Sequence, residues 1–160
     1  MSFISNVSFI LNGEAVVWDG NPAARLLTVL REEFGNTGVK CGCMEGECGA
    51  CSVILNGELV NSCMVAMGSA AGAEIITIEG YKHTERFAVL DKAFGSAGAA
   101  QCGFCTPGMV MAAECLLREN PNPTEDDIRA GISGNLCRCT GYNSIVKAIA
   151  IAAKEGEGLW

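Results

Sequence analysis

The sequence of 160 residues is poor in histidine and in long apolar runs. Its one histidine, His83, offers no convincing constellation for a Ser-His-Asp triad or for zinc catalysis, and we expect it to lie in a surface loop. No apolar run approaches the roughly 20 residues that span a bilayer. No G-x-G-x-x-G or Walker sequence is present, so we expect neither a membrane span nor unaided nucleotide binding.

Charge is also scarce. Only 18% of the residues are charged, the formal net charge is −7, and no basic stripe stands out, which argues against nucleic acid and anionic lipid as partners. The first six residues lack a positive region and a cleavage site, so we expect no secretory signal and a cytoplasmic protein. The hydrophobic fraction of 49% excludes disorder.

Cysteine, by contrast, is abundant. The ten cysteines lie at positions 41, 43, 48, 51, 63, 102, 105, 115, 137 and 139. They could form a disulfide framework or bind metal. Disulfides persist in oxidising compartments, and nothing here indicates export. A disulfide between Cys137 and Cys139 would close a strained ring. The composition therefore favours metal-bound thiolates.

The first cysteine set has the spacing of plant-type [2Fe–2S] ferredoxins, C-x4-C-x2-C…C. Its members are Cys43, Cys48, Cys51 and Cys63. Glycines recur between them, and these let the backbone N–H groups approach and donate to negatively charged sulfur. Zinc sites more often have two tight cysteine pairs. Cys41 would demand a six-residue gap, so Cys43 is the better ligand and Cys41 is expected to be structural.

The second cysteine set is Cys102-x2-Cys105 followed by Cys137-x-Cys139. Spacing alone allows zinc, an iron–sulfur cluster or a redox-active dithiol. Each pair precedes a predicted helix, one from Pro107 and one from Ser144, and the N-terminal dipoles of both would stabilise thiolates. The remaining cysteine, Cys115, is expected to be a buried apolar residue of the first of these helices.

The two halves of the chain differ in their patterns, which together predict an α+β protein with domains at 1–80 and 81–160. The first half shows two hairpins with Asn-Gly turns (7–18 and 53–60), a helix over 22–34 and a last strand over 74–78, which together predict a β-grasp, ferredoxin-like sheet. In the second half, a connector over 79–83 leads to helices after Thr84, Pro107, Thr124 and Ser144. No β pattern intervenes, so we expect a four-helix bundle.

Three motifs taken together resemble the iron–sulfur subunit of the xanthine dehydrogenase family, the molybdenum hydroxylases. They are Gly42-Cys43-x2-Gly46-x-Cys48-Gly49-Ala50-Cys51, Gln101-Cys102-Gly103-Phe104-Cys105-Thr106-Pro107-Gly108 and Gly134-Asn135-Leu136-Cys137-Arg138-Cys139-Thr140-Gly141-Tyr142. The resemblance covers almost the whole chain. It implies two [2Fe–2S] clusters, one in each half, and an electron-transfer role without catalysis by this chain alone.

The resemblance further implies partners: a large subunit with the molybdopterin-type molybdenum cofactor and a subunit with FAD, in a hetero-oligomer such as a dimer of heterotrimers. Electrons would leave molybdenum through the cluster of the second set, then through that of the first set, and reach FAD. Gln101 matches the family residue whose side chain contacts the pterin, and Cys139 lies near it; a role for Gln101 in capping the local turn is the alternative.

The substrate of such a complex is open. Family frequency favours an N-heterocycle such as a purine, with aldehydes, nicotinate, carbon monoxide and aromatic thioesters as alternatives. Two other classes of function are weighed as well: a free-standing iron–sulfur redox sensor and a scaffold structured by zinc.

Overall fold

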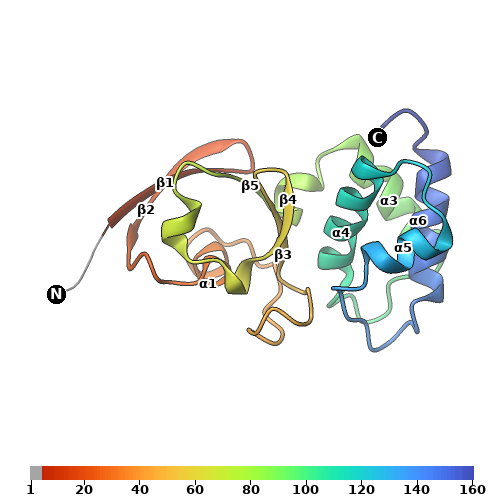
Figure 1. Ribbon diagram of the computed structural model, residues 1–160, viewed down its shortest axis with the longest axis horizontal. Helices are drawn as coiled ribbons and strands as arrows, with labels where there is room; N and C mark the ends of the chain where they lie inside the picture. The colour runs from red at the N-terminus through yellow and green to blue at the C-terminus, as the bar shows by residue number, and fades with distance from the viewer. Residues whose placement is uncertain (1–4) are drawn as a thin grey trace.

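A computed structural model describes residues 5–160; the first four residues of the N-terminal stretch considered above lie outside the described part. The chain is a mixed α+β protein in which a five-stranded sheet and a group of helices lie side by side (Figure 1). Within residues 5–160, no helix has both the length and the apolar character required to cross a membrane.

The sheet has the strand order β2-β1-β5-β3-β4. Its strands are β1 (Ser5–Leu11), β2 (Glu14–Gly20), β3 (Ser52–Leu55), β4 (Glu58–Asn61) and β5 (Glu74–Ile76). Strands β1 and β5 are parallel, and the other pairs are antiparallel. Both predicted hairpins form, because Asn12-Gly13 and Asn56-Gly57 take the positive φ angles that a two-residue turn requires.

One face of the sheet is covered by helix α1 (Leu26–Glu32). Val7, Phe9 and Leu11 alternate toward this core, where they meet Leu26 and Leu30. Two short 3₁₀ turns, Ser62–Met64 and Met67–Ala70, pack against α1 and add buried residues to the same core. The first half thus has a hydrophobic core of its own.

Two expectations about the first half are wrong in their boundaries. The helix predicted from Pro22 begins at Leu26, because Arg25 pairs with Ala66 as an isolated β-bridge and its backbone is extended. The predicted strand 74–78 ends at Ile76, and the predicted connector contains a helical turn, α2 (Ile78–Tyr81).

The second half contains four longer helices around another hydrophobic core. They are α3 (Glu85–Ser96), α4 (Thr106–Glu119), α5 (Glu125–Gly131) and α6 (Asn143–Glu155). Two of their starts follow from local chemistry that the sequence predicts. The hydroxyl of Thr84 accepts the N–H of Phe87, and Thr124 with Asp127 forms a reciprocal capping box.

Helix α4 joins the two halves, since it packs against β3 and β4 as well as against α3 and α5. Its Glu114 is only 3% exposed, and its carboxylate accepts from three groups: Tyr81 Oη (2.6 Å), Arg86 Nη1 (2.9 Å) and Trp160 Nε1 (2.7 Å). Burial and the adjacent carboxylate hold the pKa of Tyr81 well above its usual range, so the phenol remains a proton donor.

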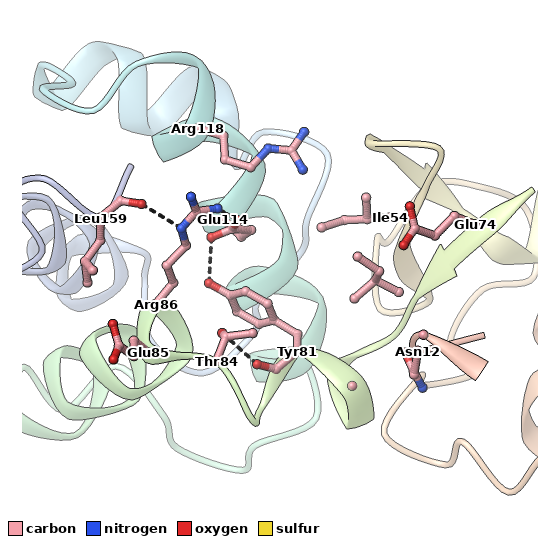
Figure 2. A pocket seen from close by; sticks show the side chains of 13 residues that line it. Asn12, Ile54, Glu74, Tyr81, Thr84, Glu85, Arg86, Glu114, Arg118 and Leu159 are labelled. Carbon is pink, nitrogen blue, oxygen red and sulfur yellow. Dashed lines mark hydrogen bonds and ion pairs between the residues drawn. The ribbon is translucent and has the colours of Figure 1, made fainter. Parts of the chain in front are cut away.

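A pocket of about 510 Å³ opens beside this buried carboxylate, between the sheet and the helices (Figure 2). Arg86 donates there to the carbonyl of Leu159 at 2.7 Å. Arg118, on the same helix as Glu114, donates to Gly57 O in the β3–β4 turn at 2.6 Å. No cysteine lines this pocket, so its residues belong to the junction between the halves rather than to the candidate metal centres.

Replacement of Glu114 by alanine is expected to destabilise the chain by about 2–3 kcal/mol, because three buried or half-buried donors lose a charged acceptor. Urea unfolding followed by circular dichroism measures this loss. The matched control is Lys92→Ala, which removes the exposed ion pair with Glu155 and should cost less than about 1 kcal/mol. Equal losses of unfolding free energy in the two variants would contradict the prediction that Glu114 stabilises the chain more than the exposed ion pair does.

Candidate metal centres

The first cysteine loop, which carries Cys43, Cys48 and Cys51, follows α1 and turns its backbone N–H groups toward the sulfur of Cys43. The sulfur of Cys43 accepts from three of them at 3.3–3.4 Å, those of Glu45, Glu47 and Cys48. These donors, that of Glu45 foremost, lower the pKa of the Cys43 thiol to about 7. The loop therefore stabilises a thiolate, which is the form that binds metal.

The four cysteines of the first set lie as two close pairs. Cys43 and Cys48 are half-buried, and the Cys48 side chain lies close enough to act on the pKa of Cys43. Cys51 and Cys63 are both buried, and the Cys63 side chain lies close enough to act on the pKa of Cys51. Burial raises the pKa of the Cys51 thiol to about 11, so metal binding at this pair must displace a proton.

Neighbouring residues fix the shape of this loop. Arg25 donates to the carbonyl of Met44, and Asn61 Nδ2 donates to Gly46 O at 2.8 Å. A Cβ at Gly42 would lie 2.7 Å from the sulfur of Cys48, closer than carbon and sulfur can approach. The glycine is therefore needed for the loop to wrap its own sulfur atoms closely.

The second set also forms two pairs. The sulfur atoms of Cys102 and Cys139, both exposed, are 3.6 Å apart. Cys105 and Cys137, both half-buried, lie close enough for Cys137 to raise the pKa of Cys105. Cys105 directly precedes α4, while Cys139 lies a few residues before α6, so both pairs stand near helix N-termini as the sequence predicts.

Local donors act on the second set too. The N–H of Phe104 and the contact with Cys139 lower the pKa of Cys102. For Cys137, burial opposes ionisation, but hydrogen bonds from Thr140, whose hydroxyl lies 3.1 Å from the sulfur, from the N–H of Cys139 and from Cys105 together outweigh burial and lower the pKa. Burial raises the pKa of Cys105 to about 12. Each set thus combines a stabilised thiolate with a thiol whose pKa burial raises, Cys51 in the first set and Cys105 in the second.

This pairing fits a [2Fe–2S] cluster, in which each iron takes two protein thiolates. All ten cysteines lie within residues 5–160, and none of them forms a disulfide. Within the same range, no three histidine, cysteine or acidic side chains converge as they would around a single ion. Both sets offer the sulfur pairs and the N–H donors that such a cluster requires, and the first set adds the close approach of Gly42 to the sulfur of Cys48.

The structure also places the predicted residues outside the two cysteine sets. Gln101 is exposed beside the second set, and its Nε2 donates to Gly98 O at 3.3 Å. Cys115 is buried in α4 as expected, and burial raises the pKa of its thiol to about 11. Cys41, which we expected to be structural, is exposed. His83 is exposed, in the turn after α2.

Residues that sequence reasoning missed hold the loops in place. Tyr142 accepts the N–H of Cys137 at its hydroxyl, 3.0 Å away, and Asn135 reaches from the second loop to the first. Both residues belong to the sequence motif around Cys137, but the sequence does not show which groups they bind. The two loops lie at the same edge of the molecule (Figure 1).

Family models describe the chain as two iron–sulfur units. A "2Fe-2S iron-sulfur cluster binding domain" matches residues 9–74, and a "[2Fe-2S] binding domain" matches residues 77–150. Each match contains one complete cysteine set. The fold and the sites thus define a protein with two [2Fe–2S]-binding domains.

Relatives along the full length narrow the class further. The nicotinate dehydrogenase small FeS subunit of Eubacterium barkeri is 49% identical over 93% of this chain and 95% of the relative. The aldehyde oxidoreductase of Megalodesulfovibrio gigas is 48% identical over 84% of this chain, but over only 15% of its own length. The solved quinoline 2-oxidoreductase of Pseudomonas putida 86 superposes with a TM-score of 0.88 at 42% identity, covering 96% of this chain and 98% of that one.

The chain belongs to the small iron–sulfur subunits of the xanthine dehydrogenase family of molybdenum hydroxylases. Its role is that of an electron-transfer subunit of a molybdenum-dependent oxidoreductase. The resemblance found in the three motifs is confirmed.

A series of cysteine variants tests which sulfur atoms are ligands. Cys43→Ser is expected to abolish one of the two [2Fe–2S] signals in the electron paramagnetic resonance spectrum of the reduced chain, because serine removes a thiolate that three N–H groups support. Cys41→Ser and Cys115→Ser are the matched controls and should retain both signals. Loss of a signal in Cys41→Ser would show that the ligand was wrongly chosen.

Proposed function

We propose that this chain relays single electrons from a molybdopterin site on a large partner subunit, through two [2Fe–2S] clusters, to FAD on a further subunit. The observation that carries the proposal is the arrangement of eight cysteines as four close pairs, two in each half. Bound clusters supply one-electron redox chemistry; the protein supplies their ligands, burial and hydrogen bonding.

The proposed ligands of the first cluster are Cys43, Cys48, Cys51 and Cys63, and those of the second are Cys102, Cys105, Cys137 and Cys139. The proximity of Cys43 to Cys48, and of Cys51 to Cys63, supports one pair for each iron. The 3.6 Å contact between Cys102 and Cys139, and the proximity of Cys105 to Cys137, support the same division in the second set.

The finer architecture is part of the same proposal. The five-stranded sheet with α1 across one face supports a β-grasp, ferredoxin-like domain over residues 1–80. The helices α3, α4, α5 and α6 around a second core support a four-helix-bundle domain over residues 81–160. Ile54 and Tyr81 join the second core, so the proposed boundary runs through a packed junction rather than a free linker.

The proposed partners are a large molybdopterin-binding subunit and an FAD-binding subunit, in a hetero-oligomer such as a dimer of heterotrimers. The length of the aldehyde oxidoreductase supports them, since the segment matched by this chain is 15% of that polypeptide. Exposed Phe104 and Leu136 flank the second cysteine set and support a contact with the large subunit there. Gln101 and Cys139, both exposed on this side, are the proposed contacts with the pterin.

The proposed substrate class is an N-heterocycle, with an aldehyde as the second candidate. Nicotinate and quinoline, which appear in the names of two relatives, are nitrogen heterocycles. The aldehyde oxidoreductase supports the alternative at a similar identity. We propose a cytoplasmic location for the complex.

Purification of the chain from its native source tests the proposal. We expect about four iron and four sulfide per chain and a large molybdenum-containing subunit that co-purifies with it. A chain that carries both clusters but purifies alone, without a stable partner, would favour a redox sensor. A chain that binds only zinc and lacks visible absorption would contradict the proposal.

Gln101→Ala in the assembled complex tests the pterin contact. We expect the rate of electron delivery to the second cluster to fall roughly 10-fold, as is usual when a residue beside a metal ligand is lost. Rapid-mixing reduction by substrate measures this rate, and iron content should be unchanged. If the side chain only caps the local turn through Gly98 O, the rate will be unaltered and only thermal stability will fall.

A further inference from the structure

The two cysteine loops touch each other through the backbone. The N–H of Leu136 donates to the carbonyl of Cys48 at 2.9 Å. Leu136 directly precedes Cys137, and Cys48 belongs to the first set. One peptide unit and one hydrogen bond therefore connect a proposed ligand of the second cluster with a proposed ligand of the first.

Asn135 reinforces this contact from a buried position. Its side chain is 4% exposed, and its Nδ2 donates to Gly49 O at 3.0 Å and to Ser52 Oγ at 3.2 Å. Its own N–H donates to Ile132 O at 2.9 Å, which fixes its backbone to the end of α5. The amide thus holds the first loop, directly beside Cys48, against the second loop, two residues from Cys137.

Two glycines permit the close approach. Gly49 has a φ of +66°, and a Cβ on it would lie 2.4 Å from Gly134 O in the second loop. A Cβ on Gly108, in the first turn of α4, would lie 2.4 Å from Gly49 O. Side chains at either position would push the loops apart, so the contact requires glycine at both positions in addition to its hydrogen bonds.

The halves also meet away from the cysteines. Arg118 donates to Gly57 O at the opposite end of α4 from the cysteine loops, and this bond joins the same two halves. Besides the packing of α4 on β3 and β4, hydrogen bonds therefore join the halves at two places within residues 5–160, and only the one at Asn135 includes residues of both cysteine motifs.

We propose that Asn135 is a positioning residue for electron exchange between the two cysteine sets: its buried amide keeps the Leu136 N–H and the Cys48 carbonyl in contact. The inference rests on the proposed function. The step moves one electron, so that the centre of one set is oxidised by one equivalent and that of the other reduced by one. No bond forms or breaks, and no proton is transferred.

The test uses the full chain with both clusters loaded. Asn135→Leu keeps the branching at Cγ but removes the donor. In the fully reduced unaltered chain we expect spin–spin splitting of the electron paramagnetic resonance signals from the two clusters. In Asn135→Leu we expect loss of this splitting and slower equilibration of a single electron between the sets after flash reduction, with iron content unchanged.

Gly108→Ala is the second variant and decides the question if Asn135→Leu does not fold. Alanine is a better helix former than glycine, so helix α4 itself is not weakened, but its Cβ strikes the carbonyl of Gly49. The same loss of splitting is expected. Arg118→Ala is the control: it removes the other bond of the junction, lowers thermal stability and should retain both the splitting and the rate.

The outcomes separate the two proposals. An unaltered chain that lacks about four iron atoms would overturn the proposed function and this inference with it. Four iron atoms with unchanged splitting and rate in the Asn135 and Gly108 variants would overturn only the role of Asn135. Equal loss of splitting in Arg118→Ala would also overturn it, because any loosening of the junction would then suffice.

Discussion

Backbone N–H groups must reach negatively charged sulfur, and this constraint shapes both cysteine loops. Three N–H groups surround Cys43, and Thr140 together with the local backbone supports Cys137. A loop that curls this tightly exposes its carbonyls on the opposite side, and those of Cys48 and Gly49 find donors on the second loop. The contact between the halves therefore follows from the way the first loop stabilises thiolates.

The sequence predicts most where the physical signal is local. Asn-Gly turns need positive φ at two adjacent residues, and both predicted hairpins form. The capping box at Thr124 depends on residues three positions apart and is likewise present. The spacing of the cysteines identifies the two sets, because thiolate ligands of iron–sulfur clusters occur at characteristic intervals along a sequence.

Prediction fails where a distant partner decides. The start of α1 depends on the bridge between Arg25 and Ala66, which lie forty-one positions apart and give no local signal. The turn α2 occupies a stretch that resembles a connector, yet Tyr81 is buried there against Glu114. Within the site, spacing cannot show which cysteine pairs with which, nor that Asn135 reaches Gly49. These facts depend on how the two halves pack.

The contact between Asn135 and Gly49 joins positions 86 apart in the chain. The first half has its own core and can fold as soon as it has left the ribosome, but the carbonyls of Cys48 and Gly49 lack their donors until the second loop is made. At about 5–20 residues per second, synthesis of the intervening 86 residues takes roughly 4–17 s. During translation, the first loop therefore has a brief period in which the second loop does not yet fix its backbone.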